Sequence, residues 1–399
     1  MSVSEHSDRA HRTPAGGVAL ALIAPLLLLF TASFAVPVMM MLSRGVTDTE
    51  LQQTWPRTAE LLKHWNGQGR PDSALVRTLA TEMLASHRTG TLSLVANRLN
   101  YDVAGSRSLI YSTAAHLESG ATVRDLDDLA ALDTRWREAA IWSTLRHAAG
   151  PTTSLYLLAA LDRKLDSEDR IVSVPSEQSV FIRVFMRTLQ ISTVVTLLCI
   201  ALGYPVAHAL ASLPAKYANL MLILVLLPFW TSTLVRTCAW VALLQTHGLV
   251  NNFLAALGFI EEPLKLLYNR AGVYIAMTHV LLPYFILPLY GVMKTLSPDT
   301  LRAASSLGAP PLTAFLNIYL PQTFPGVLAG AVIVFTLALG YYVTPALVGG
   351  GGDQMISASI AFYAHQSLNW GMAAALSLLL LLPLALIGLA RQSLLRAAS

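Results

Sequence analysis

The chain has 399 residues, of which 54% are hydrophobic and only 13% are charged. Soluble domains carry about 25% charged residues, so this composition excludes an ordinary soluble protein and favours one that crosses a membrane several times. The net charge of +4 does not indicate nucleic-acid binding, because the basic residues are scattered or lie at the ends of apolar runs.

The sequence carries no signature of a catalytic or metal site. Both cysteines, Cys199 and Cys238, lie in apolar runs, so no disulfide framework is predicted outside the membrane. We find no metal-ligand cluster, no nucleophile motif and no G-x-x-x-x-G-K-[ST] phosphate loop. The glycines of 349–352 are followed by Asp353, not by Lys-Ser/Thr. We therefore predict that the chain is not an enzyme, binds no cofactor or metal, and has no ATPase site.

The N-terminal region predicts a short tail and one span. Residues 1–14 are polar and include Arg9 and Arg12, and the first span is predicted over residues 15–42. A signal peptide has an apolar region of about 7–15 residues. The apolar run 17–42 is longer than that, so we favour an uncleaved span.

Residues 43–186 are predicted to form a soluble insertion between the first and second spans. Leu75, Leu79 and Met83 follow helical spacing in a charged background, and similar patterns recur along the segment. The segment is long enough to bury a core of its own. We predict a mostly helical domain whose Trp and Leu residues pack in that core. Two roles stay open: docking of a partner protein, or packing alone.

The rest of the chain, residues 187–395, is predicted to be a bundle of five more helices. Prolines inside the apolar runs predict kinks, because neighbouring helices or water must satisfy the freed carbonyls, and the third span is expected to bend. The five predicted spans are 188–210, 217–244, 272–293, 323–347 and 372–391.

Basic residues predict the orientation. With the N-terminus inside, the short outside loops hold only Lys265 and Arg270. The inside segments hold Arg9, Arg12, Lys216, Lys294, Arg302, Arg391 and Arg396. The positive-inside rule therefore predicts cytoplasmic termini and a periplasmic insertion.

One substantial polar stretch, residues 297–321, is predicted on the cytoplasmic side. Ser297 suits an N-cap and Pro298 the first helical position, with Asp299 at the positive end of the helix dipole. Gly308 suits a helix stop. The prolines at 310 and 311 can start a second helix, so the stretch is expected to form a helix, a turn and a helix.

This stretch resembles the EAA loop of ABC-importer permeases. The match rests on Ala303, Ala304, Gly308 and the Ile318-x-Leu320-Pro321 ending. The resemblance implies coupling helices that dock into a cleft of a cytoplasmic ATPase, through Arg302, Ala303, Ala304, Ser305, Leu307, Gly308, Ile318, Leu320 and Pro321. The family usually has Glu at the position of Arg302, which reverses one charge. An ordinary capped loop between two spans is the alternative.

Further segments resemble the spermidine/putrescine branch of the same permeases: 228–237, 251–254, 266–268, 282–290 and 343–350. The resemblance covers about 187–395. It implies an all-α fold of six spans and a second permease subunit, which we expect to be a different chain. It also implies an ATPase dimer that holds ATP-Mg, and a periplasmic solute-binding protein.

Candidate path residues lie where the spans break: Trp230, Arg236, Tyr341, Tyr342 and Thr344. Arg236 either gates the path, pairs with a partner carboxylate, or extends to the membrane surface. Polyamine-type members often carry an acidic residue after the glycine at 340, where this chain has Tyr341. Its ring could hold an ammonium, or it could belong to the interfacial aromatic belt.

Glu261, Glu262 and Asp353 are the acidic residues expected near the outer mouth. They either attract cations or are simply solvated. The histidines at 208, 247, 279 and 365 have no ligand spacing and are interpreted as structural.

We therefore predict an ABC-importer permease in the bacterial inner membrane that passes a small organic solute, with a polyamine such as spermidine or putrescine favoured. An amino acid or opine-like compound is the alternative substrate. A membrane receptor with an external sensing domain would need a cytoplasmic signalling domain, which the residues after Leu389 do not supply. An ion-driven transporter would favour membrane carboxylates or inverted repeats, and we see neither.

Overall fold

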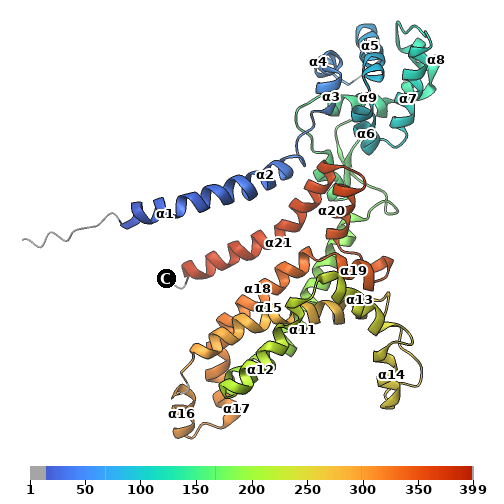
Figure 1. Ribbon diagram of the computed structural model, residues 1–399. Coiled ribbons are helices and arrows are strands. Elements are labelled where there is room, and N and C mark those ends of the chain that lie inside the picture. Colours follow the sequence, from blue (N-terminus) through green and yellow to red (C-terminus); the bar gives the residue numbers. More distant parts are fainter. Residues whose placement is uncertain (1–14, 68, 167, 298, 398–399) are drawn as a thin grey trace, which may run out of the picture.

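The computed structural model describes residues 15–67, 69–166, 168–297 and 299–397 (Figure 1). The predicted tail with Arg9 and Arg12, and Pro298, lie outside these residues. In the described part the strands are two short ones, β1 (Arg163–Leu165) and β2 (Ile171–Ser173), which pair antiparallel. The rest of the regular structure is helical, which confirms the all-α prediction.

The N-terminal span is one long rod built from α1 (Ala15–Phe30), a π-turn at Thr31–Ala35 and α2 (Val36–Ser43). Its segment Leu22–Ser43 has a mean hydropathy of 2.2, and none of it is buried within the chain. Figure 1 shows this rod apart from the other helices, with α2 near α21 (Trp370–Ala397). An apolar rod of this kind needs lipid or another subunit around it.

The insertion folds as a helical domain at one end of the molecule (Figure 1). Its helices are α3 (Glu50–Thr54), α4 (Pro56–His64), α5 (Ser73–Thr89), α6 (Leu92–Asp102), α7 (Ser106–Glu118), α8 (Leu126–Leu132), a 3-10 turn at Thr134–Arg137, α9 (Ala139–Ala148) and α10 (Leu155–Ala160). The hairpin of β1 and β2 then leads to α11 (Phe181–Ser212). The membrane helix thus begins before residue 186, the predicted end of the insertion.

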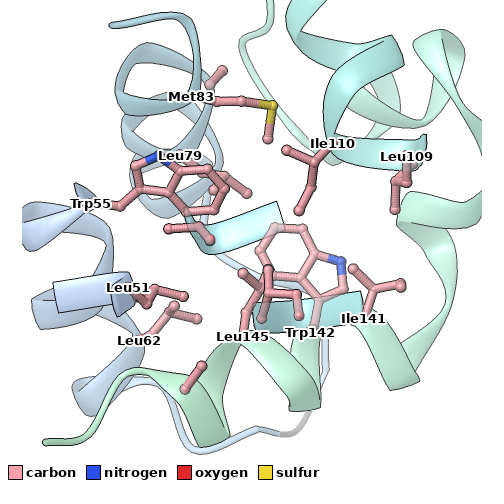
Figure 2. Close-up of a cluster of buried hydrophobic side chains, with 14 of the residues drawn as sticks. Leu51, Trp55, Leu62, Leu79, Met83, Leu109, Ile110, Ile141, Trp142 and Leu145 are labelled. Carbon is pink, nitrogen blue, oxygen red and sulfur yellow. The ribbon is translucent and has the colours of Figure 1, made fainter. Parts of the chain in front are cut away.

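The core of this domain is built around tryptophans, as Figure 2 shows for Trp55 and Trp142. Each of the three buried indole N–H groups has a partner. Trp55 donates to Ser86 Oγ at 2.9 Å, Trp136 to Thr113 Oγ1 at 2.8 Å, and Trp142 to the carbonyl of Trp136 at 2.8 Å. A buried indole without an acceptor would lose a hydrogen bond. The interpretation of these tryptophans as core residues is confirmed.

The remaining membrane helices are α12 (Ala215–Leu226) with a 3-10 turn at Leu227–Trp230, α13 (Thr233–Leu244), α15 (Arg270–Thr295), α18 (Leu320–Gly340) and α21. Within the described residues, five helices are long and apolar enough to span a membrane, and a sixth span results if the bent pair around residue 231 counts as one. That pair bends by 99°. The predicted six spans and the bend in the third agree with this count. Three shorter helices were not predicted: α14 (Leu249–Ala256), α19 (Val343–Val348) and α20 (Ile356–His365).

The centre of the bundle is the contact of α11, α15 and α18. Phe285 of α15 is fully buried between Gly203 of α11 and Gly330 of α18. A Cβ on Gly203 would lie 2.5 Å from the Phe285 ring, and one on Gly330 would lie 2.8 Å from the same ring. Only glycine lets the three backbones approach this closely.

The prediction for the fifth span was wrong at both ends. The helix runs from Pro311 to Gly340, whereas the prediction placed it at 323–347. A widened π-turn at Phe315–Tyr319 directly precedes Pro321. Proline has no backbone N–H to donate, and the widened turn accommodates this missing hydrogen bond, so the helix continues. At the other end Tyr341 is extended, which ends the helix and leaves α19 separate.

Candidate functional site

The polar stretch after α15 forms the predicted helix, turn and helix. Ser297 Oγ accepts from the backbone N–H of Asp299 at 3.2 Å and caps α16 (Asp299–Ser306). Gly308 has φ +82°, and the N–H of Ala309 reaches back to the carbonyl of Ala304 at 3.0 Å. This is the usual glycine-ended helix geometry. α17 (Pro311–Ala314) then leads through the π-turn into α18.

This stretch forms an exposed projection at the end of the molecule opposite the insertion (Figure 1). Leu307, between α16 and α17, is 88% exposed and Leu312 of α17 is 69% exposed, and several exposed apolar side chains in one short projection are typical of a surface that another protein covers. Of the implicated residues Ala304 is buried and Ile318 half-buried, whereas Arg302, Ala303, Ser305, Leu307, Gly308, Leu320 and Pro321 are exposed.

Arg302, which stands where the family usually has Glu, pairs with a residue of its own helix. Its Nη1 lies 3.3 Å from Asp299 Oδ1, one helical turn earlier, and both side chains are largely exposed. An exposed pair of this kind contributes little stability. It nevertheless reduces the charge that Arg302 presents to a partner.

An aromatic cluster (Tyr204, His208, Phe315 and Tyr319) connects the π-turn to α11. The His208 ring lies 5.1 Å from the ring of Tyr319 and 5.7 Å from that of Phe315. Tyr204 Oη lies 3.0 Å from Thr323 Oγ1. The cluster was not predicted from the sequence. Its signal is the pairing of two aromatic i, i+4 spacings, 204/208 and 315/319.

Arg236 stabilises the break in the third span, a role that sequence analysis did not consider. Its guanidinium donates to the carbonyl of Pro228, to the carbonyl of Thr231 at 2.9 Å and to Thr233 Oγ1 at 3.2 Å. A broken helix leaves carbonyls without donors, which is costly in a membrane. The neighbouring Trp230 is 76% exposed.

Replacing Arg236 with methionine should therefore destabilise the protein. The Pro228 carbonyl also accepts from Thr231, so the Thr231 carbonyl is the one left without a donor, which is expected to cost about 1–3 kcal/mol and to lower the Tm of the detergent-purified protein. Arg236→Lys should recover part of the loss, since an ammonium keeps the charge but lacks the planar fork. A methionine variant that melts like the wild type would contradict this role.

The breaks in the third and fifth spans lie side by side. α13 packs against α19, and the hydroxyls of Thr237 and Thr344 are 3.0 Å apart and buried. Tyr341 is half-buried and its carbonyl accepts from Ser357 Oγ at 2.7 Å, while Tyr342 is exposed. The fold thus brings together candidate path residues from segments about a hundred residues apart in the sequence.

Asp353 is not the solvated acid that was expected. It is buried, its Oδ1 lies 2.9 Å from Arg270 Nε, and its Oδ2 accepts from the N–H of Gly350 at 3.2 Å. Its charge is therefore compensated within the chain. Glu261 and Glu262 are exposed. Among the described residues no group of three or more His, Cys, Asp or Glu could hold a metal ion.

Comparison with known proteins places this geometry in a family. A family model described as binding-protein-dependent transport system inner membrane component matches residues 200–397. The spermidine/putrescine transport system permease protein PotB of Escherichia coli K12 is 36% identical over 200 residues, which cover 50% of this chain and 73% of that protein. This chain belongs to the family. It is a multi-pass inner-membrane component of a transport system, of the ABC-importer permease type.

Further relatives carry either the same substrates or others in their names. PotB of Haemophilus influenzae is 33% identical over 207 residues, covering 52% of this chain and 72% of that protein. The molybdenum transport system permease protein ModB of Mycobacterium bovis is 31% identical over 219 residues, covering 54% and 79%. A solved bacterial ABC transporter that imports alginate aligns with a TM-score of 0.44 at 18% identity, covering 55% of this chain and 80% of that one. The family model begins after the insertion.

Proposed function

We propose that this permease passes a polyamine such as spermidine or putrescine across the inner membrane, energised by a separate cytoplasmic ATPase dimer. The observation that carries the substrate is the 36% identity to PotB over half of the chain. The observation that supports the ATPase is the exposed apolar projection of α16 and α17 with Leu307 between them.

The partners follow from the same assembly. ATP-Mg binds to the ATPase, because this chain has no phosphate loop. A second permease subunit, which we expect to be a different chain, and a periplasmic solute-binding protein complete the importer. In this proposal the termini and the 297–321 loop lie in the cytoplasm and the insertion lies in the periplasm. There the insertion either docks a partner protein or has only a packing role.

A second substrate class has specific support. Tyr341 stands where polyamine-type members often have an acidic residue, and Asp353 is neutralised by Arg270. Both features reduce the negative charge available to a polycation. Another small organic solute, such as an amino acid or an opine-like compound, is therefore the alternative.

Co-purification and uptake test the two levels of this proposal separately. The tagged chain, purified gently from its native membranes, should bring down an ABC ATPase and a second permease. Uptake of radiolabelled spermidine or putrescine should fall to background when the gene is deleted and recover with the wild-type chain. A chain that purifies without any ATPase contradicts the importer. An ATPase complex without polyamine uptake contradicts only the substrate, and competition with unlabelled amino acids then identifies the alternative.

A further inference from the structure

A cavity of about 740 Å³ lies where the insertion meets the membrane helices. Its lining comes from four segments: residues 40–50 from the end of α2 to the start of α3, helix α6, Tyr156 of α10, and residues 367–371 at the start of α21. The candidate path residues at the breaks of the third and fifth spans are not among its lining residues. The cavity is therefore separate from the site described above.

The apolar surface of the insertion indicates that this cavity lies at the level of the membrane surface. Helices α4, α5, α7, α8 and α9 expose none of their large apolar side chains. The exposed ones are Val46, Leu94 and Tyr101 around the cavity, and Leu161, Ile171, Val180 and Ile182 near the hairpin and the start of α11. A soluble domain with exposed apolar residues only at its base is turned toward an apolar phase. Trp370, exposed at the start of α21, is a typical interfacial residue.

A buried arginine supplies the polar part of the cavity. Arg98 is only 2% exposed. Its Nε donates to Asp48 Oδ2 at 2.5 Å, Nη2 pairs with the same oxygen, and the guanidinium lies 5.7 Å from the Tyr156 ring centre. Nη1 is buried and has no hydrogen-bond partner among the described residues, and the same holds for the acceptor Asp48 Oδ1. Such donors are nearly always satisfied in folded proteins, so an acceptor from outside the chain is expected in this cavity.

The charges around Arg98 have both signs. Arg44, exposed at the end of α2, and Glu50 of α3 line the same cavity. Asp48 already compensates Arg98, so a plain anion would meet one further cation and one carboxylate. A ligand that carries both a phosphate and an ammonium group complements this arrangement, because guanidinium groups bind phosphate well and Glu50 can accept from an ammonium.

We propose that the cavity binds the headgroup of an aminophospholipid from the membrane leaflet on the side of the insertion. The phosphate lies between Arg44 and Arg98, the ammonium lies near Glu50, and the acyl chains run along Met40 and the exposed Leu94. The apolar rim distinguishes a lipid from a free headgroup, which would leave that rim in water. The bound lipid joins the insertion to the first and last spans, which both contribute to the lining of the cavity.

Native mass spectrometry of the full complex tests this proposal. The complex is reconstituted in nanodiscs of equal phosphatidylethanolamine and phosphatidylglycerol and then released into detergent. One phosphatidylethanolamine per copy of this chain should be retained. The double variant Arg44→Gln with Glu50→Gln should lower that retention about tenfold, since it removes charge-assisted contacts. Arg98 is left intact because its removal would leave the buried Asp48 without its ion-pair partner.

The matched control is Arg77→Gln, which removes an exposed arginine on α5, away from the cavity. It should retain the lipid as the wild type does. Equal retention of both lipids in the wild type and the double variant overturns the proposal. A second outcome would also overturn it. If millimolar glycerophosphoethanolamine displaced the bound lipid as efficiently as intact phosphatidylethanolamine does, the headgroup alone would be the ligand.

Discussion

Replacing Gly308 with valine should reduce ATP-driven uptake roughly tenfold while the chain still reaches the membrane. Gly308 has φ +82°, and a Cβ there would meet no atom within 4 Å. The obstacle is thus the backbone conformation and not space. An L-residue in this conformation costs about 1–2 kcal/mol, and a β-branched residue is especially unfavourable. The turn that sets α16 against α17 should therefore be lost.

Two controls separate this effect from a general loss of stability. Gly308→Asn should retain most of the uptake, because asparagine tolerates the left-handed region. Gly258→Val imposes a similar strain, since Gly258 has φ +72° and open space, but in the loop after α14. It should leave uptake near the wild-type rate. Uptake in cells, with membrane abundance measured by immunoblot, gives the comparison. Full activity of Gly308→Val would contradict the coupling role.

Replacing Gly330 with alanine should destabilise the membrane bundle even though only one methyl group is added. The new Cβ would lie 2.8 Å from the Phe285 ring and 2.9 Å from the Phe285 carbonyl oxygen. A side chain can move, but a backbone carbonyl inside α15 moves only with its helix. Overpacking of this kind costs about 1–3 kcal/mol, so the Tm in detergent should fall and uptake with it.

Gly291→Ala is the matched control, because Gly291 lies on the same helix as Phe285 and a Cβ there meets no atom within 4 Å. Its Tm should equal or exceed that of the wild type, since alanine is the better helix former. Equal melting of the Gly330 and Gly291 variants would show that α15 and α18 do not approach as closely as described.

Features that depend on local composition could be predicted from the sequence. Long charge-free segments predicted the spans because about 20 apolar residues are needed to cross a membrane. The cap at Ser297 and the positive φ of Gly308 followed from residue types that favour these conformations. The helical insertion with its tryptophan core followed from apolar spacing.

Features that depend on contacts between distant residues were decided only by the tertiary structure. Asp353 was expected in solvent, but Arg270, far away in the sequence, pairs with it. Arg236 satisfies carbonyls of a break whose geometry the sequence did not specify. The fifth span continued through Pro321 because a π-turn precedes it.

The same distinction explains the two sites. The residues of the 297–321 loop are neighbours in the chain, so their types and spacing were sufficient to predict its helix, turn and helix. The cavity around Arg98 joins the end of α2, helix α6 and the start of α21. Periodicity describes which face of each helix is apolar, but it carries no information on which distant faces meet. Residue types and local spacing were therefore enough to predict the number of spans and the helix, turn and helix of residues 297–321. Only the packing of the helices decided which charges are paired and where an unpaired donor is buried.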